Sequence, residues 1–312
     1  MLNIYISGED GVLQEINEFA KGAWVHLTAP DEEEIQKVVQ SLGIPADFIR
    51  DPLDEEERSR IDKEGDNLLI IVDIPILENE GSRDEQYITI PLGMIVTPDL
   101  FITVCLKETP IVQQFITNKI KNFYTYMKTR FILQLLYRIS TYYLTYLKQI
   151  NRKTSKLENK LQESMQNQEL FSMLSLEKSL VYFTTSLKTN NLVTEKLLKN
   201  QYLKMYEEDQ HLLEDVIIEN KQAMEMTEIY SHILSGMMDA FASVISNNVN
   251  HVMKVLTSFT IVLTFPTMVA SLFGMNVPLP FEHYRHAFLI ILLLSLLLSC
   301  ITAMIFWKKK YF

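Results

Sequence analysis

Polar residues recur near the carboxyl end of this 312-residue chain, at alternating steps of four and three. A repeat of 3.5 residues places its members on one face of a helix. Between Val255 and Phe273 almost every other position is apolar, so hydroxyl and amide oxygens would form a single polar stripe. Such neutral oxygens can bind water or a hydrated cation. The stripe consists of Asp239, Ser243, Ser246, Asn250, Met253, Thr257, Thr260, Thr264, Thr267, Ser271 and Gly274.

Two interpretations of this stripe stay open. Lipid cannot satisfy polar groups, so the stripe must face protein or water, as it would in a pore. Alternatively, Ser and Thr bond back to a carbonyl one turn earlier, and small residues let membrane helices pack closely. The pore interpretation requires a symmetric ring of subunits, because two spans in one chain cannot enclose a channel.

Two hydrophobic stretches, residues 255–275 and 287–307, are each near the ~20 residues that cross a bilayer core. Lys308, Lys309 and Lys310 follow the second stretch directly, whereas the loop between the stretches has Arg285 as its full positive charge. By the positive-inside rule the carboxyl end is cytosolic. We therefore expect a multi-pass protein of the cell (inner) membrane with an extracytoplasmic loop at residues 276–286.

The amino-terminal part of the chain is acidic. Residues 1–100 carry 7 Lys or Arg against 23 Asp or Glu, which argues against nucleic acid as a partner. Acidic runs at residues 31–34 and 54–57 are typical of solvated surface, although they could also concentrate cations. Met1 to Gly11 shows no signal peptide, so we expect this end in the cytosol too.

Enzyme motifs are missing from the sequence. It has no phosphate-binding glycine loop, no metalloprotease histidine pair and no nucleophile elbow. The two cysteines, Cys105 and Cys300, cannot form a disulfide framework, and the six histidines are scattered. The chain is therefore not expected to be an enzyme.

Glycine and proline separate a first region from a helical one. None lies between Ile111 and Ser235, which predicts helix throughout that stretch. Before it, Asp31 to Leu42 has the start signal, apolar face and terminal Gly43 of a helix. Short runs rich in β-branched residues predict strands at 68–74, 87–90, 94–96 and 100–106.

The helical region contains two polar breaks, near residues 164–168 and 189–191, which predict about three helices. The last helix would continue into the first span, and ~70 residues at ~1.5 Å each make a rod of about 100 Å. The expected parts are an α/β domain (1–110), a helical hairpin region (111–200), a stalk (201–254), a first transmembrane helix (255–275), a loop (276–286), a second transmembrane helix (287–307) and a basic tail (308–312).

The carboxyl-terminal part resembles the CorA family of magnesium channels. The matching residues are Asn250 to Thr257 (NHVMKVLT), then Gly274, Met275 and Asn276 at the end of the first span, a second span and terminal lysines. Weaker similarity covers Trp24 to Leu27 and Ser235 to Asp239. The resemblance implies an α+β fold with a cytosolic α/β domain, a long helical stalk and two transmembrane helices, in a funnel-shaped homopentamer.

The same resemblance implies site residues. Gly274, Met275 and Asn276 would form a selectivity filter, where amide oxygens accept hydrogen bonds from the hydration shell that Mg²⁺ gives up reluctantly. Mg²⁺ would be both transported and regulatory, and Co²⁺ and Ni²⁺ are further candidate ions. The implied pore-lining residues are Asn250, Met253, Leu256, Thr257, Thr260, Thr264, Thr267 and Ser271.

Regulation is implied at carboxylates between subunits, with Asp215 and Asp239 on the stalk helix and Glu78 in the α/β domain. Glu282 in the loop would help to attract cations. Two alternatives remain at this point: a zinc transporter of the same superfamily, resembling ZntB, or a membrane-anchored coiled-coil scaffold. The scaffold would show no ion flux.

Overall fold

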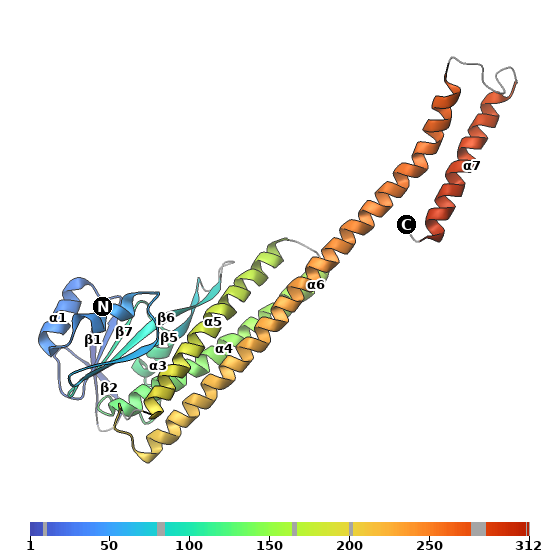
Figure 1. Ribbon diagram of the computed structural model, residues 1–312. Coiled ribbons are helices and arrows are strands. Elements are labelled where there is room, and N and C mark those ends of the chain that lie inside the picture. Colours follow the sequence, from blue (N-terminus) through green and yellow to red (C-terminus); the bar gives the residue numbers. More distant parts are fainter. Residues whose placement is uncertain are drawn as a thin grey trace. The chain divides into compact units, whose positions relative to one another are not determined.

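The computed structural model of the chain describes residues 1–8, 11–79, 85–163, 167–199, 202–275, 285–309 and 311. It forms two compact units, Met1–Gly236 and Met237–Phe312. The first unit holds a β-sheet with helices and the second holds the carboxyl-terminal helices (Figure 1). The α+β fold class with an amino-terminal sheet domain, a long helix and two apolar carboxyl-terminal helices is confirmed.

The sheet of the first unit has the strand order β2-β1-β3-β7-β6-β5-β4. The pair β3 and β7 is parallel and the other neighbours are antiparallel. The strand bounds are β1 Leu2–Ser7, β2 Leu13–Ile16, β3 Trp24–Thr28, β4 Arg60–Glu64, β5 Asn67–Glu78, β6 Gln86–Val96 and β7 Phe101–Cys105.

The two strands predicted at 87–90 and 94–96 are one strand, β6, so that part of the prediction is wrong. Pro91 and Gly93 do not interrupt the strand. The β7 ladder starts at Leu92, so the missing N–H of Pro91 lies beyond the end of β7. At Gly93 a Cβ atom would lie 2.3 Å from Cγ of Pro52, so this strand needs glycine for the close approach of η1 (Asp51–Leu53).

One face of the sheet is covered by α1 (Glu32–Leu42) and α2 (Ala46–Arg50). The predicted start and stop of α1 are confirmed. Asp31 accepts a hydrogen bond from the backbone N–H of Glu34 in a capping box, and Gly43 adopts a left-handed φ of 63°. Ile35 and Val38 are the buried side of this helix.

The other face packs against α3 (Pro110–Ile116), α4 (Lys128–Glu163) and α5 (Asn167–Lys199). Successive residues of a strand point to opposite faces, which places Val25 toward α1 and Trp24 toward an aromatic cluster. In that cluster Phe131 of α4 contacts the rings of Trp24, Phe101 and Phe115. Figure 1 shows α4 and α5 running alongside each other beyond this face.

The prediction of helix from 111 to 235 is wrong between α3 and α4. Residues 117–127 are turns, and Asn118 and Asn122 both adopt a φ of 53°, a conformation that asparagine tolerates. The segment is held to β1 because Thr125 Oγ1 accepts a hydrogen bond from the backbone N–H of Ser7 (3.1 Å). Absence of glycine and proline therefore does not ensure a helix.

The predicted break at 189–191 is also wrong, since α5 continues through it. The central residue of this predicted break is buried against the sheet. Asn190 is 4% exposed, donates to the carbonyl of Asp73 (2.7 Å) and accepts from the N–H of Asp73 (2.9 Å). The last long helix is α6 (Glu207–Phe273), with 67 residues against the ~70 expected from the sequence. It is followed by α7 (Ala287–Lys308).

His26 on β3 predicts a stability that depends on pH. It is 5% exposed and hydrogen-bonds the hydroxyls of Thr103 (2.8 Å) and Thr28 (2.9 Å), while burial lowers its pKa from 6.5 to about 4. Between these values the unfolded chain binds a proton that the folded chain excludes, so stability falls as pH falls from 6.5 toward 4, by about 3 kcal/mol.

The measurement is urea unfolding at several pH values, followed by fluorescence of Trp24 in a Trp307→Phe background. His26→Gln should flatten the dependence on pH over this window. His232→Gln, at an exposed histidine of α6, is the matched control and should leave the slope unchanged. An equal slope in the His26 variant would contradict the assignment.

Candidate functional site

The eight residues predicted to line a pore share one exposed face of α6. In the single chain all eight have exposed side chains. Residues on the other side of the same helix are covered, including Ser258 (2% exposed) and Val269 (7% exposed). The exposed residues are Asn250, Met253, Leu256, Thr257, Thr260, Thr264, Thr267 and Ser271.

Within the second unit, α7 covers the side of α6 away from the polar stripe. The hydroxyl of Ser299 on α7 donates to the carbonyl of Val262 (3.1 Å), which fixes the direction of the contact. At 3.6 residues per turn, Thr264 and Ser271 lie within about 20° of the direction opposite Val262. The stripe is therefore not used to pack the two helices of one chain together.

The Ser299 contact has a structural cause in Pro266. A proline inside a helix has no N–H for the carbonyl four residues earlier, which here is that of Val262. In a membrane this carbonyl needs another partner, because no lipid group can donate to it. Ser299 supplies the missing hydrogen bond, so the irregularity of α6 is compensated from α7.

Replacing Ser299 by alanine should weaken the packing of α7 on α6 by ~0.6–2 kcal/mol, because the Val262 carbonyl is left without a donor. The measurement is the midpoint of thermal unfolding in detergent. Ser295→Ala is the matched control, since Ser295 is also buried on α7 but donates to Leu292 of its own helix. Pro266→Ala restores a backbone N–H for the Val262 carbonyl, so adding Ser299→Ala to this variant should hardly change the unfolding midpoint. If Ser299→Ala lowers the midpoint as much in this background as in the unmodified protein, the mechanism is contradicted.

Three threonines of the stripe use their hydroxyl protons within α6. Thr260 donates to the carbonyl of Leu256 (2.9 Å), Thr264 to that of Thr260 (2.7 Å) and Thr267 to that of Thr264 (2.8 Å). These hydrogen bonds to carbonyls about one turn earlier are the ones expected if the threonines only serve helix packing. Each hydroxyl oxygen keeps lone pairs that can still accept hydrogen bonds.

The stripe ends at the predicted filter. Gly274 follows the last residue of α6, and its N–H donates to the carbonyl of Ala270 (3.0 Å). A Cβ atom at Gly274 would lie 3.2 Å from that same carbonyl oxygen, a tight approach that favours glycine. Met275 is exposed beside it. Asn276 and Glu282 lie outside the described residues.

The three predicted regulatory carboxylates are not assembled into a metal site within one chain. Glu78 ends β5 and pairs with Lys107 (2.7 Å), and Asp215 is exposed on α6; both belong to the first unit. Asp239 belongs to the second unit. No group of three or more His, Cys, Asp or Glu side chains that could hold a metal ion occurs in the part of the chain that the structure describes.

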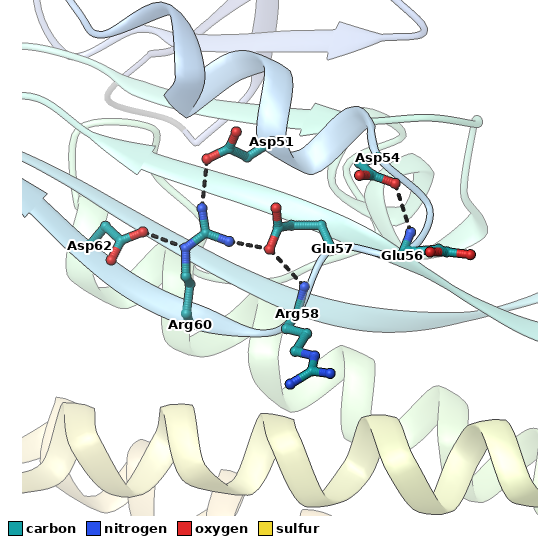
Figure 2. Close-up of polar contacts among 7 residues, drawn as sticks. All are labelled: Asp51, Asp54, Glu56, Glu57, Arg58, Arg60 and Asp62. Atoms are coloured by element: carbon teal, nitrogen blue, oxygen red, sulfur yellow. Dashed lines mark hydrogen bonds and ion pairs between the residues drawn. The ribbon is translucent and has the colours of Figure 1, made fainter.

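The acidic segment before β4 is partly neutralised by Arg60, as Figure 2 shows. The guanidinium of Arg60 contacts the carboxylates of Asp51 (2.6 Å), Glu57 and Asp62. Burial raises the pKa of Asp51, although Arg60 opposes the rise. These carboxylates therefore anchor one arginine rather than form a free cation site.

The remaining charges of this segment face solvent. Asp54 accepts a hydrogen bond from the backbone N–H of Glu56 (3.0 Å) and so stabilises a turn. The side chain of Arg58 points away from the Arg60 cluster in Figure 2. Asp54, Glu55 and Glu56 are all exposed. This arrangement fits the solvated-surface interpretation of the acidic run.

Both helices of the second unit have the length and apolar composition needed to cross a membrane. A family model described as CorA-like Mg²⁺ transporter protein matches residues 19–310. The chain belongs to the CorA-like Mg²⁺ transporter family. The resemblance seen in the sequence is thus confirmed, and because CorA-family proteins are transporters, the chain is not an enzyme.

Two curated CorA relatives are similar in sequence. The cobalt/magnesium transport protein CorA of Methanocaldococcus jannaschii is 28% identical over 294 residues, which cover 92% of this chain and 90% of the relative. The cobalt/magnesium transport protein CorA of Thermotoga maritima is 25% identical over 170 residues, which cover 54% of this chain and 48% of the relative.

The solved structures agree with this membership. The complete CorA magnesium transporter from Methanocaldococcus jannaschii matches with a TM-score of 0.85 and 25% identity, covering 100% of this chain and 99% of that one. The ZntB cytoplasmic domain from Vibrio parahaemolyticus matches with a TM-score of 0.58 and 13% identity, covering 80% and 97%. The ZntB likeness shows the fold alone and gives the zinc alternative no separate support.

Sequence reasoning placed the CorA-like stripe on α6 but missed its relation to α7. Ser299 was absent from the predicted site, although a signal was available. Pro266 frees a carbonyl inside a membrane helix, which requires a donor from a neighbour, and Ser295 and Ser299 are the polar residues at helical spacing in the middle of the second span.

Proposed function

We propose that the protein is a channel-type transporter for Mg²⁺ across the cell membrane, with Co²⁺ and Ni²⁺ as further candidate ions. The observation that carries this proposal is the position of the polar stripe, opposite the side of α6 that α7 covers. Lipid offers no donor to the hydroxyl oxygens of a stripe left free by its own chain, which favours contact of the stripe with other subunits or water. The name of the relative in Methanocaldococcus jannaschii, a cobalt/magnesium transport protein, supports the choice of ions.

The proposed assembly is a homopentamer around one axis. Each subunit would turn the α6 stripe inward and place α7 between the pore helix and lipid, in agreement with the contact of Ser299 on the opposite side. The highly apolar α7, with Ser295 and Ser299 as its buried residues, suits that outer position. Closed rotational symmetry is the arrangement in which identical stripes meet.

Selectivity is proposed for the ring that Gly274, Met275 and Asn276 form at the end of α6. Mg²⁺ prefers octahedral oxygen coordination and loses water reluctantly. A ring of Asn276 amide oxygens would accept hydrogen bonds from the hydrated ion without removing its shell. Because the amides are neutral, they would also release the ion. Glu282 would raise the cation concentration at the entrance.

Gating is proposed farther along the stripe. Met253 and Leu256 are exposed on the same face as the polar residues and would form hydrophobic rings. A narrow apolar ring closes a pore when water leaves it. Asn250 would provide a polar ring on one side of this constriction, and Thr257 one on the other.

Regulation by intracellular Mg²⁺ is proposed between neighbouring subunits. Asp215 of one subunit and Glu78 of another would share an ion, with Asp239 as a further carboxylate on the stalk part of α6. Bound Mg²⁺ would cancel the repulsion of these carboxylates and hold the ring closed. Glu78 is already paired with Lys107, so ion binding would have to displace that lysine.

Replacing Asp215 by lysine should abolish the Mg²⁺-dependent protection of the protein from protease, since a cation would then occupy the proposed ion position. The measurement is limited proteolysis over a Mg²⁺ titration. Glu214→Lys makes the same charge change one residue away, on a different side of α6, and should keep the protection. Unchanged protection in the Asp215 variant would count against this carboxylate.

The proposed topology keeps both termini in the cytoplasm. The α/β domain (1–110), the helical hairpin region (111–200) and the stalk (201–254) would be cytosolic, as would the tail at 308–312. The helices at 255–275 and 287–307 would cross the bilayer, and the loop at 276–286 would be extracytoplasmic. The three lysines at 308–310, which follow the span at 287–307, support this orientation by the positive-inside rule.

The deciding experiment is Mg²⁺ uptake into vesicles that contain the purified protein, compared with protein-free vesicles. A channel should produce flux that rises when Mg²⁺ inside is depleted. The coiled-coil scaffold predicts none, and a zinc transporter predicts uptake of Zn²⁺ in preference to Mg²⁺. Absence of Mg²⁺ flux from correctly assembled protein would rule out the proposed function.

A further inference from the structure

A cavity of about 550 Å³ lies within the first unit, apart from the polar stripe of α6. Its walls come from the segment after α3, from the first turns of α4 and from the first turns of α6. The volume falls within the range of small-molecule sites. We call it the basic cavity after its four cationic lining residues, Lys119, Lys121, Arg130 and Arg138.

The basic cavity concentrates positive charge in a chain whose net charge is −10. Two carboxylates also line it, those of Glu208 and Asp215. Glu208 is already paired with Nη1 of Arg130 (2.8 Å). Cations gathered on a concave wall raise the local concentration of anions.

The other three cations are available to a ligand. Among the residues that the structure describes, the side chains of Lys119, Lys121 and Arg138 have no hydrogen bond or ion pair. Lys119 and Lys121 are exposed, so water can satisfy their ammonium groups in place of protein partners. Arg138 is half-buried on α4, where an unpaired guanidinium is less easily explained. Its planar fork of donors matches phosphate oxygens.

Two of the residues that line the cavity, Arg130 and Gln134, also carry a buried polar atom without a partner. Nε of Arg130 and Oε1 of Gln134 are buried and lack hydrogen bonds; over the described ranges, two further side-chain atoms share this condition. Leaving such atoms unsatisfied costs roughly 1–3 kcal/mol each. One is a donor and the other an acceptor, so a bare anion would satisfy only the first of them.

We propose that the basic cavity binds a phosphorylated small molecule that also carries a hydroxyl or amino group. Arg138 and Lys121 bind the phosphate oxygens. On binding, the side chains of Arg130 and Gln134 turn toward the cavity, so that Nε of Arg130 donates to the phosphate and Oε1 of Gln134 accepts a hydrogen bond from the organic part. The proposal does not rest on ion conduction, since no residue of the stripe contributes to the cavity.

The experiment is isothermal titration of the full-length protein in detergent, at low ionic strength and with chelator present, using ATP and inorganic pyrophosphate as probes. Both probes should bind, ATP more tightly, and affinity should fall as salt is added. Arg138→Gln should weaken both probes roughly ten- to a hundredfold, the size of a charged hydrogen bond. Lys121→Gln, at an exposed position, repeats the test with little risk to folding.

Two further variants separate the parts of the proposal. Gln134→Leu should weaken ATP several-fold and leave pyrophosphate nearly unchanged, because only ATP has an organic part with hydroxyl and amino donors for Oε1. Lys37→Gln, on the exposed side of α1, removes a charge elsewhere and should change neither affinity. No binding of either probe, equal losses with Lys37→Gln, or no effect of Arg138→Gln and Lys121→Gln would overturn the site. Equal affinities for the two probes would overturn the organic part of the ligand.

Discussion

Replacing Asn276 by alanine should reduce Mg²⁺ uptake into protein-containing vesicles by roughly tenfold or more. In the proposed channel the amide oxygens of this residue form the ring that contacts the hydrated ion. Without these oxygens the hydrated ion would meet a ring of apolar methyl groups. Losing even one hydrogen bond of ~1.4 kcal/mol corresponds to a tenfold change in the rate of uptake. The measurement is the initial rate of Mg²⁺ uptake, reported by a Mg²⁺-sensitive dye inside the vesicles.

Asn247→Ala is the matched control for this substitution. Asn247 lies on the same helix, α6, and is exposed, but it falls outside the 3.5-residue repeat of the stripe. Its replacement should leave uptake close to that of the unmodified protein. Equal reductions in both variants would mean that the effect is structural, and unchanged uptake in Asn276→Ala would remove the filter from the proposal.

Local signals in the sequence were sufficient for elements whose shape depends on their own residues. The cap residues of α1, Asp31 at its start and Gly43 at its end, are recognisable in the sequence, and both ends were predicted correctly. The length of α6 follows from a stretch without glycine or proline as far as Gly236, whose pattern continues into the first hydrophobic span, and the prediction was accurate to a few residues. The terminal hydrophobic stretches were equally clear.

Elements that depend on distant contacts were not predictable in this way. The turns at 117–127 contain no glycine or proline, and they are held in place by a hydrogen bond between Thr125 and Ser7, 118 residues away. Asn190 reads as a helix break in the sequence, yet it lies inside α5 because β5 supplies partners for its amide. In both cases a tertiary hydrogen bond decides the local structure.

The candidate site likewise has one part that was predictable from local sequence and one part that depends on distant contacts. Periodicity alone identified which residues of α6 share a face, and the structure adds where α7 lies relative to that face. The bond between Ser299 and Val262 was not predicted, since it requires knowing which positions of two helices meet. The basic cavity was missed for a similar reason. Lys121, Arg138 and Asp215 are far apart in sequence and meet only after α4 and α6 pack.

Replacing Thr264 and Thr267 together by valine should reduce Mg²⁺ uptake roughly tenfold, because two consecutive polar levels of the proposed pore become apolar. Valine keeps the shape of threonine but has no oxygen to accept hydrogen bonds from water, and an apolar stretch of a pore favours loss of water. Packing should change little, since both hydroxyls bond within their own helix. The measurement is again the initial rate of uptake into vesicles.

Thr302→Val provides a control with the same chemistry on α7. Thr302 also donates to a carbonyl of its own helix, that of Leu298 (2.9 Å), so its replacement costs the same kind of bond. If the threonines of α6 only reinforce the helix, this variant and the double variant should reduce uptake alike. If they supply oxygens to a water-filled path, the double variant alone should do so. Comparable effects of the two would therefore contradict the pore interpretation of the stripe, whatever the flux of the unmodified protein.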